Sequence, residues 1–386
     1  MSCDYGTARG WRSRLKKTIE LLLTTKSSCD KPWLLNLKTE IAKALRTHTL
    51  LICIILFYSA VCLSVAGIYG VKEKVSLLLY FDNLGVLIIL VFLIFIIGRS
   101  KFVTYFFREG PFKQHILNDL RTNYLNTERL CNTLLVFFLL SIFLSAFTSF
   151  KIILPDIHPF SWDYTFAKWD AFIHGGKQPW ELLQPILGRP FLTSTVSFFY
   201  HLWFLVMYGV ICWQAFSLRN RFLRMQFLLT YALLWILLGT VTAIIFSSAG
   251  PCYYGRVVGG EDIYLPLMEY LRSAKDSYPV WALTTQEMLW QAYSNRELGQ
   301  VKGISAMPSM HVSIAFLFVL VGWRAHRISG IVFSIFAFII MLGCVHLGWH
   351  YAIDAYTSIV LTCLVWWAVS CILKRYGTAI GLETNQ

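Results

Sequence analysis

Two separated stretches of the chain place ionisable side chains in otherwise apolar sequence. The first, GISAMPSMHVSIAFLF at residues 303–318, carries His311 at the start of an apolar run. The second, CVHLGWHYAIDAY at residues 344–356, carries two histidines and an aspartate. Burying such groups in hydrocarbon is costly unless a partner satisfies them, so ionisable residues in these surroundings usually serve a function.

The spacing in the second stretch suggests nucleophilic or acid–base chemistry. Asp354 follows His350 by four residues, so on a helix the two side chains share a face. A carboxylate there can accept the N–H of one imidazole nitrogen and leave the other nitrogen free as a nucleophile or base. His346 is a candidate substrate contact. These residues and His311 could instead bind zinc, but no glutamate base accompanies them and we expect no metal.

The first stretch predicts anion binding. Pro308 suits the first turn of a helix and Ser305 is a candidate N-cap, so the free N–H groups of that turn would attract an anion such as phosphate. The hydroxyl of Ser309 is a candidate phosphate contact, although a serine in a first turn is often only a cap. Lys302 and Arg256 could add positive charge.

The composition predicts a membrane protein. The chain has 386 residues, of which 56% are hydrophobic and only 14% charged. A soluble domain usually carries about 25% charged residues, so this chain has too little polar surface to remain in water. The net charge of +13 lies in the N-terminal segment and short connectors, not in a basic patch, and we expect no nucleic-acid partner.

Eight apolar runs are long enough to cross a bilayer as helices, which need about 20 residues each. They lie near 49–71, 77–98, 131–153, 191–216, 223–246, 305–323, 329–347 and 353–373. Open sheets cannot cross lipid because their edges leave backbone groups unpaired. The predicted fold class is therefore all-α, a polytopic transmembrane helical bundle of about eight spans.

Basic residues predict the orientation of the bundle. The connectors 99–130, 217–222 and 324–328 carry lysine and arginine, as do the N-terminal segment and the C-terminal tail. The positive-inside rule places these segments and both termini in the cytoplasm. The histidines then face the other compartment, which is a periplasm, the exterior or an organelle lumen. The aromatic outward loop 154–190 is expected to form a short helix along the membrane surface.

The outward loops hold further candidates. Tyr253 and Tyr254 could contact substrate at a lipid-facing mouth, although anchoring at the membrane interface explains tyrosines there equally well. We expect Asp170 and His174 to have a structural role in the first long loop.

AMPSMH followed by HYAID resembles the two later motifs of the type-2 phosphatidic acid phosphatase superfamily. The likeness is closest to the inositol-phosphorylceramide synthase branch, to which SSAGPCYY at residues 247–254 is also similar. Members are six-helix membrane enzymes that cleave or transfer phosphate esters through a phosphohistidine, without a metal or other cofactor. The resemblance implies that His350 is the nucleophile, Asp354 its partner and His311 the acid that protonates the leaving oxygen.

The chain departs from the family in its phosphate-binding residues. The early lysine–arginine motif is not recognisable, and the usual serine–arginine pair before the nucleophile reads Gly343-Cys344. Arg256, Lys302 or Arg189 would then substitute. The missing arginines favour the synthase branch over the phosphatases.

The resemblance implies a division of the chain. We expect a basic cytoplasmic segment with an amphipathic helix at 1–48, and two additional spans with a connector at 49–130. A six-helix catalytic core would follow at 131–375, and a cytoplasmic tail at 376–386.

These observations predict an integral-membrane phosphotransferase that moves a head group from a lipid phosphoester to a hydroxyl acceptor, as in sphingolipid synthesis. The alternative is a lipid phosphate phosphatase of the phosphatidic acid or polyprenyl phosphate type, with water as the acceptor. A transporter is disfavoured, because the polar residues gather at one face and not near the midplane. We infer no obligate protein partner.

Overall fold

The computed structural model describes residues 32–81, 126–295 and 303–377, and every regular element within them is a helix. The segment 1–31, most of the predicted amphipathic region, lies outside the described residues. So do Lys302 and all but the first five residues of the predicted span 77–98.

Six helices in the described part of the chain are long and apolar enough to cross a membrane, and the chain is an integral membrane protein. They are α3 (Thr49–Ile68), α6 (Thr127–Ile157), α9 (Pro190–Phe216), a continuous run over Arg221–Ile245, α16 (Arg327–His346) and α17 (Ala352–Tyr376). A shorter apolar helix, α15 (Met310–Ala325), matches a seventh predicted span. The polytopic helical fold is therefore confirmed.

The run over Arg221–Ile245 is not a uniform helix. It consists of α10 (Arg221–Ile236), the π-helical turn η3 (Leu237–Thr242) and α11 (Ala243–Ile245). Within η3 the hydroxyl of Thr240 lies 2.7 Å from the hydroxyl of Tyr58 on α3. The N-terminal span α3 thus contacts the rest of the bundle at the point where the helix is irregular.

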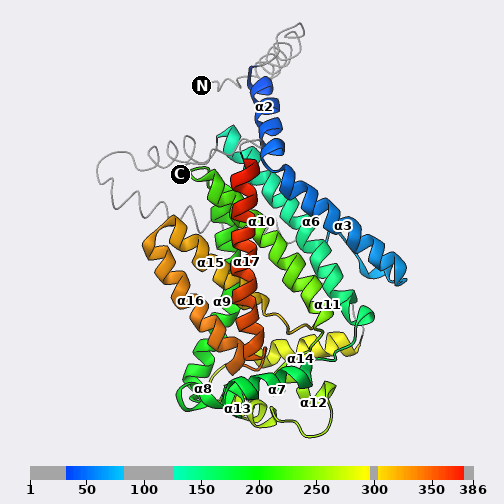
Figure 1. Cartoon of the computed structure of the whole chain (residues 1–386), viewed down its shortest axis with the longest axis vertical. Coiled ribbons are helices and arrows are strands. Elements are labelled where there is room, and N and C mark those ends of the chain that lie inside the picture. Colours follow the sequence, from blue (N-terminus) through cyan, green and yellow to red (C-terminus); the bar gives the residue numbers. More distant parts are fainter. Residues whose placement is uncertain (1–31, 82–125, 296–302, 378–386) are drawn as a thin grey trace, which may run out of the picture.

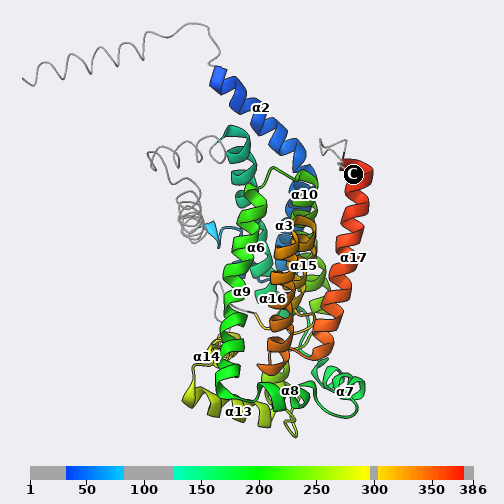
Figure 2. The same cartoon turned by 90° about the vertical axis from the view of Figure 1, so that its left-hand side faces the viewer.

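The two ends of the bundle differ. The α2 helix (Pro32–Thr47), which leads into α3, and the last turns of α17 lie at one end, as Figures 1 and 2 show. Short helices gather at the opposite end: α7 (Asp163–Ile173), α8 (Pro179–Leu187), α12 (Tyr254–Val257), α13 (Leu265–Ser277) and α14 (Trp281–Ser294). They come from the two long loops predicted to face away from the cytoplasm, and the first loop forms two helices instead of one.

The predicted start of the span at 305–323, which corresponds to α15, was wrong. The helix begins at Met310, not at residue 305, and its N-cap is Ser309, whose Oγ accepts the N–H of Val312 at 3.5 Å. The described residues just before it are not helical, because the N–H of Ala306 donates to the carbonyl of Ser248 at 2.8 Å. Pro308 therefore precedes the helix.

Candidate active site

The structure brings together the three residues to which the resemblance assigns chemistry. His311 lies in the first turn of α15, His350 in the link between α16 and α17, and Asp354 in the first turn of α17. The ring centroids of the two histidines are 6.4 Å apart. Oδ2 of Asp354 lies 3.4 Å from Nδ1 of His350.

The proton on His350 can be placed from its contacts. Nδ1 lies 2.8 Å from the carbonyl oxygen of Ala306, which can only accept a hydrogen bond. Nδ1 therefore carries the hydrogen in the neutral ring, and Nε2 keeps a free lone pair. Oδ2 of Asp354 accepts the backbone N–H of Tyr351 at 3.1 Å. Both Ala306 and Asp354 thus hold the ring in place.

The buried carboxylate of Asp163 helps to position Ala306 through the segment that lies between them. Asp163 on α7 is 2% exposed and accepts the N–H groups of Ala249 and Gly250 at 2.9 and 2.8 Å. The neighbouring residue, Ser248, accepts the N–H of Ala306 through its carbonyl. The first outward loop is therefore linked by hydrogen bonds, through the second, to the carbonyl that orients His350.

The backbone at position 250 requires a glycine. Its φ is +103°, a conformation that side chains other than glycine's rarely adopt. A Cβ there would lie 2.5 Å from the carbonyl oxygen of Trp349. The segment after α11 thus packs directly against the link that carries His350.

Aromatic side chains of α9 surround His311. The ring of Tyr200 stacks on the imidazole at 4.4 Å between centroids, and the ring of Trp203 lies at 4.3 Å. The indole N–H of Trp203 also donates to the backbone carbonyl of His311 at 3.0 Å. The two rings and this hydrogen bond fix the position of the imidazole.

Lys151 on α6 is a cation near the site that the sequence analysis missed. A Cβ on Gly303 would lie 2.7 Å from Cγ of Lys151, which places the lysine beside the segment that leads to His311. Burial lowers the pKa of His350 to about 3, and the charge of Lys151 contributes to that lowering. The signal in the sequence was a lone ionisable residue near the outward end of an apolar run.

Two further candidates have contacts within the protein. Ser309 is buried and acts as the N-cap of α15. His346 is also buried, and its Nε2 lies 2.9 Å from the hydroxyl of Thr193 on α9. Its Nδ1 has no hydrogen-bond partner among the residues that the structure describes.

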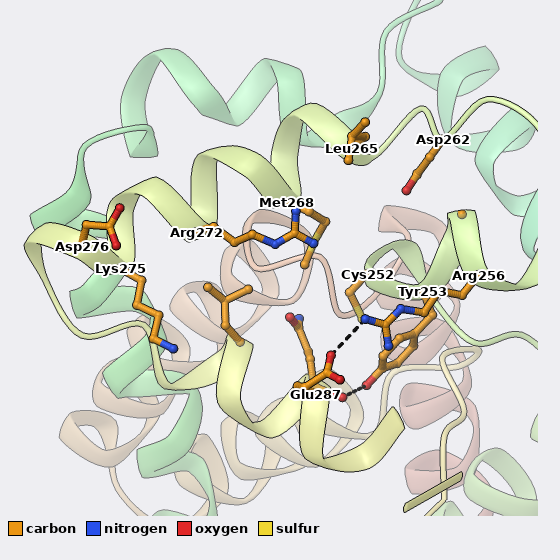
Figure 3. Close-up of a pocket in the computed structure, with 13 residues that line it drawn as sticks. Cys252, Tyr253, Arg256, Asp262, Leu265, Met268, Arg272, Lys275, Asp276 and Glu287 are labelled. Atoms are coloured by element: carbon orange, nitrogen blue, oxygen red, sulfur yellow. Dashed lines mark hydrogen bonds and ion pairs between the residues drawn. The ribbon is translucent and has the colours of Figure 1, made fainter. Parts of the chain in front are cut away.

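The remaining described candidates on and beside α12 contact residues other than the histidine pair. Arg256 forms an ion pair with Glu287 at 2.9 Å, and both line a cavity between the short helices (Figure 3). The hydroxyl of Tyr253 donates to the carbonyl of Gln286 at 2.8 Å. Tyr254 is buried against the ring of Tyr264 at 5.3 Å.

Arg189, named as a substitute for the missing arginines, is the N-cap residue of α9.

The predicted structural residues of the first loop contact α17. Asp170 accepts the N–H groups of Ala352 and Ile353 at 2.7 and 2.9 Å, so its carboxylate caps the helix. Burial raises the pKa of Asp170 to about 6, although these hydrogen bonds oppose the shift. Nε2 of His174 lies 3.0 Å from the hydroxyl of Tyr356. These contacts hold α7 against the start of α17.

Of three comparisons with known proteins, the one with protein families found a match. Searches of curated proteins and of solved structures returned no match. The family model of the PAP2 superfamily matches residues 165–368, from α7 to α17, which includes both histidine motifs and more than half of the chain. The chain therefore belongs to the PAP2 superfamily, the family of type-2 phosphatidic acid phosphatases.

Proposed function

We propose that the protein is a phosphotransferase that moves a phosphate-containing head group from a membrane lipid to a hydroxyl acceptor. Family membership supports phosphatase or phosphotransferase chemistry on lipids. The observation that carries the proposal is the state of His350. Its Nδ1 hydrogen bonds to a backbone carbonyl, its Nε2 has no hydrogen-bond partner among the described residues, and the ring centroid of a second histidine lies 6.4 Å away.

The reaction would proceed in two displacements at phosphorus. Nε2 of His350 attacks the phosphoester, the bond from phosphorus to the lipid oxygen breaks, and His311 gives that oxygen its proton. The acceptor hydroxyl then attacks the phosphohistidine while His311 takes the hydroxyl proton. The bond between phosphorus and nitrogen breaks, and Nε2 regains its lone pair. The low pKa of His350 keeps the nucleophile unprotonated at neutral pH.

Lys151 and two aromatic donors are the proposed replacements for the missing arginines. The hydroxyl of Tyr200 and the indole N–H of Trp349 are buried and lack hydrogen-bond partners in the described part of the chain. Their rings lie 6.2 Å apart and nearly parallel. A Cβ on Gly343, where the family has serine, would lie 3.2 Å from Tyr200. Buried donors without partners are costly, and phosphoryl oxygens would satisfy them.

Exclusion of water supports transfer over hydrolysis. His350 is only 7% exposed, and the segment around Gly250 packs against its link. A site closed to bulk water favours an organic hydroxyl as the acceptor. The motif resemblance further suggests a phosphoinositol donor and a sphingolipid acceptor. With water as the acceptor, the same residues would make the protein a lipid phosphate phosphatase.

An assay with labelled lipids tests the proposal. The purified protein is given phosphatidylinositol or phosphatidic acid labelled at phosphorus, with and without ceramide or another lipid alcohol. We expect a labelled acceptor, and no product from His350→Asn or His311→Asn. His326→Asn is the matched control, since His326 is the N-cap of α16 and asparagine caps helices well. Labelled phosphate from phosphatidic acid, or inositol phosphate from phosphatidylinositol, without a labelled lipid acceptor would show hydrolysis. Active His350 and His311 variants would refute enzymatic use of the pair.

A further inference from the structure

The cavity lined by Arg256 and Glu287 lies among the short helices that Figure 1 labels at the end of the bundle opposite α2, and Figure 3 shows its lining side chains. Its volume is about 510 Å³, enough for a ligand the size of a phosphorylated sugar. Its lining comes mainly from α12, α13 and α14, together with residues just before α12. The charged side chains on its wall are Arg256, Arg272, Lys275, Asp262, Asp276 and Glu287.

Two cations in this cavity are available to a ligand. Arg256 is already paired with Glu287. Arg272 and Lys275 lie three residues apart on α13 and so share a face of that helix. Neither forms an ion pair or hydrogen bond with another described residue, and both reach toward the cavity in Figure 3. Their positive charges favour an anionic ligand in the cavity.

The cavity also contains an acceptor that lacks a donor. Gln286 is 3% exposed and lines the cavity. Its Nε2 donates to the carbonyl of Leu347 at 2.8 Å, but its Oε1 has no partner among the described residues. A buried acceptor without a donor indicates a missing hydrogen-bonding group, and a hydroxyl would supply it.

We propose that this cavity binds a hydroxyl-bearing phosphate ester. Its phosphate lies at Arg272 and Lys275, and a hydroxyl donates to Oε1 of Gln286. Arginine is well suited to phosphate, because its planar guanidinium can donate two parallel hydrogen bonds. The choice of phosphate over another anion rests on the proposed function, whereas the anion site rests on the cavity itself.

Two hydrogen bonds join lining residues of the cavity to the link that carries His350. Gln286 holds the carbonyl of Leu347, and the N–H of Cys252 donates to the carbonyl of Gly348 at 2.8 Å. Leu347 and Gly348 lie in the link that leads to His350. A ligand bound to Gln286 therefore restrains the segment that positions the nucleophile, and the cavity is a second site coupled to the first.

Binding is measured on the full-length His350→Asn protein, so that turnover plays no part. Calorimetric titration compares glycerol 3-phosphate, inorganic phosphate and glycerol. We expect glycerol 3-phosphate to bind more tightly than phosphate, and glycerol not to bind. Arg272→Gln with Lys275→Gln should weaken binding at least 10-fold, since the double variant removes two charged hydrogen-bond donors to the phosphate. The control, Lys168→Gln with Lys177→Gln, removes two exposed cations elsewhere at this end.

A competition arm distinguishes a lipid head group from a soluble ester. Nanodiscs containing phosphatidylglycerol displace glycerol 3-phosphate if the natural ligand is a lipid, and phosphatidylcholine nanodiscs do not. Failure of both nanodiscs to compete assigns the site to a soluble ester. Absence of binding, or equal binding by the cavity double variant, overturns the second site. Because the His350 protein is inactive by design, that result leaves the proposed function standing.

Discussion

At the scale of single residues, the decisive feature is the protonation of His350. The Ala306 carbonyl requires hydrogen on Nδ1, and burial lowers the pKa of the ring to about 3. The four-residue spacing predicts that Asp354 shares a face with His350, and the structure places Oδ2 of Asp354 3.4 Å from Nδ1 of His350. The Ala306 contact could not be predicted, because a backbone carbonyl has no signature in the residue types.

The shifted pKa of His350 makes stability depend on pH. The unfolded ring has a pKa of about 6.5, so between about pH 3 and 6.5 the unfolded state binds more protons than the folded state. This contribution to stability is fully present above pH 6.5 and is lost as pH falls toward 3. We expect His350→Asn to flatten the pH dependence of thermal unfolding over that interval. An unchanged slope in the variant would contradict the assigned pKa.

The hydroxyl of Tyr200 offers a clean test of phosphoryl binding. Tyr200→Phe removes a group that has no protein partner in the described residues, so thermal stability should not fall. Activity should fall about 10- to 100-fold, because a hydrogen bond to a charged group contributes about 1.5–3 kcal/mol. Tyr231→Phe is the control, since that buried hydroxyl donates to the sulfur of Met207 on α9. Full activity in Tyr200→Phe would exclude this role.

At the scale of elements, α7 positions the start of α17 through the carboxylate of Asp170. Asp170→Asn keeps one side-chain oxygen as a hydrogen-bond acceptor, replaces the other with an amide NH₂ group and removes the negative charge. We expect the free energy of unfolding to fall by about 1–2 kcal/mol, in the range typical of lost helix caps. Asp276→Asn is the control, because this aspartate is exposed and caps no helix. Equal stability of both variants and the parent would show that the cap is dispensable.

At the same scale of elements, the segment at Gly250 packs closely against the backbone of Trp349. Gly250→Ala imposes both an unfavourable φ and a Cβ 2.5 Å from the carbonyl of Trp349. Gly259→Ala imposes a similar φ of +74° with nothing within 4 Å. We expect the first variant to lose at least 2 kcal/mol more stability than the second, a loss typical of steric strain (about 1–3 kcal/mol). Equal losses would mean that the segment is free to move away from the link.

At the scale of the whole molecule, the apolar runs and basic connectors predicted most of the architecture. Seven predicted spans correspond to helices in the described residues, because about 20 apolar residues suffice to specify a membrane helix. The convergence of His311 with His350 also followed, since both lie at helix ends predicted to face one side.

The sequence alone could not predict contacts made between distant segments. Lys151 and Asp163 precede His350 by more than 180 residues, and only the folded bundle brings them to its surroundings. The start of the span predicted at 305–323 was misplaced for the same reason, a contact between distant segments. Residues 305–309 are apolar or small enough to join the helix, but a hydrogen bond to the carbonyl of Ser248 holds Ala306 outside it.

The predicted orientation can be tested by cysteine labelling. In a background whose exposed native cysteines are replaced by serine, Lys177→Cys lies in the loop between α7 and α8 and Lys374→Cys in the last turn of α17. An impermeant maleimide should label Lys177→Cys in intact cells and Lys374→Cys only after permeabilisation. The reverse pattern would place the candidate active site on the cytoplasmic side.

The most direct test of the central claim is to trap the phosphohistidine. The protein is mixed briefly with a lipid phosphoester labelled at phosphorus, quenched in alkali, where phosphohistidine survives, and digested for mass spectrometry. We predict label on Nε2 of His350, and none on the His350→Asn protein. Label on another residue, or continued turnover by His350→Asn, would contradict the account.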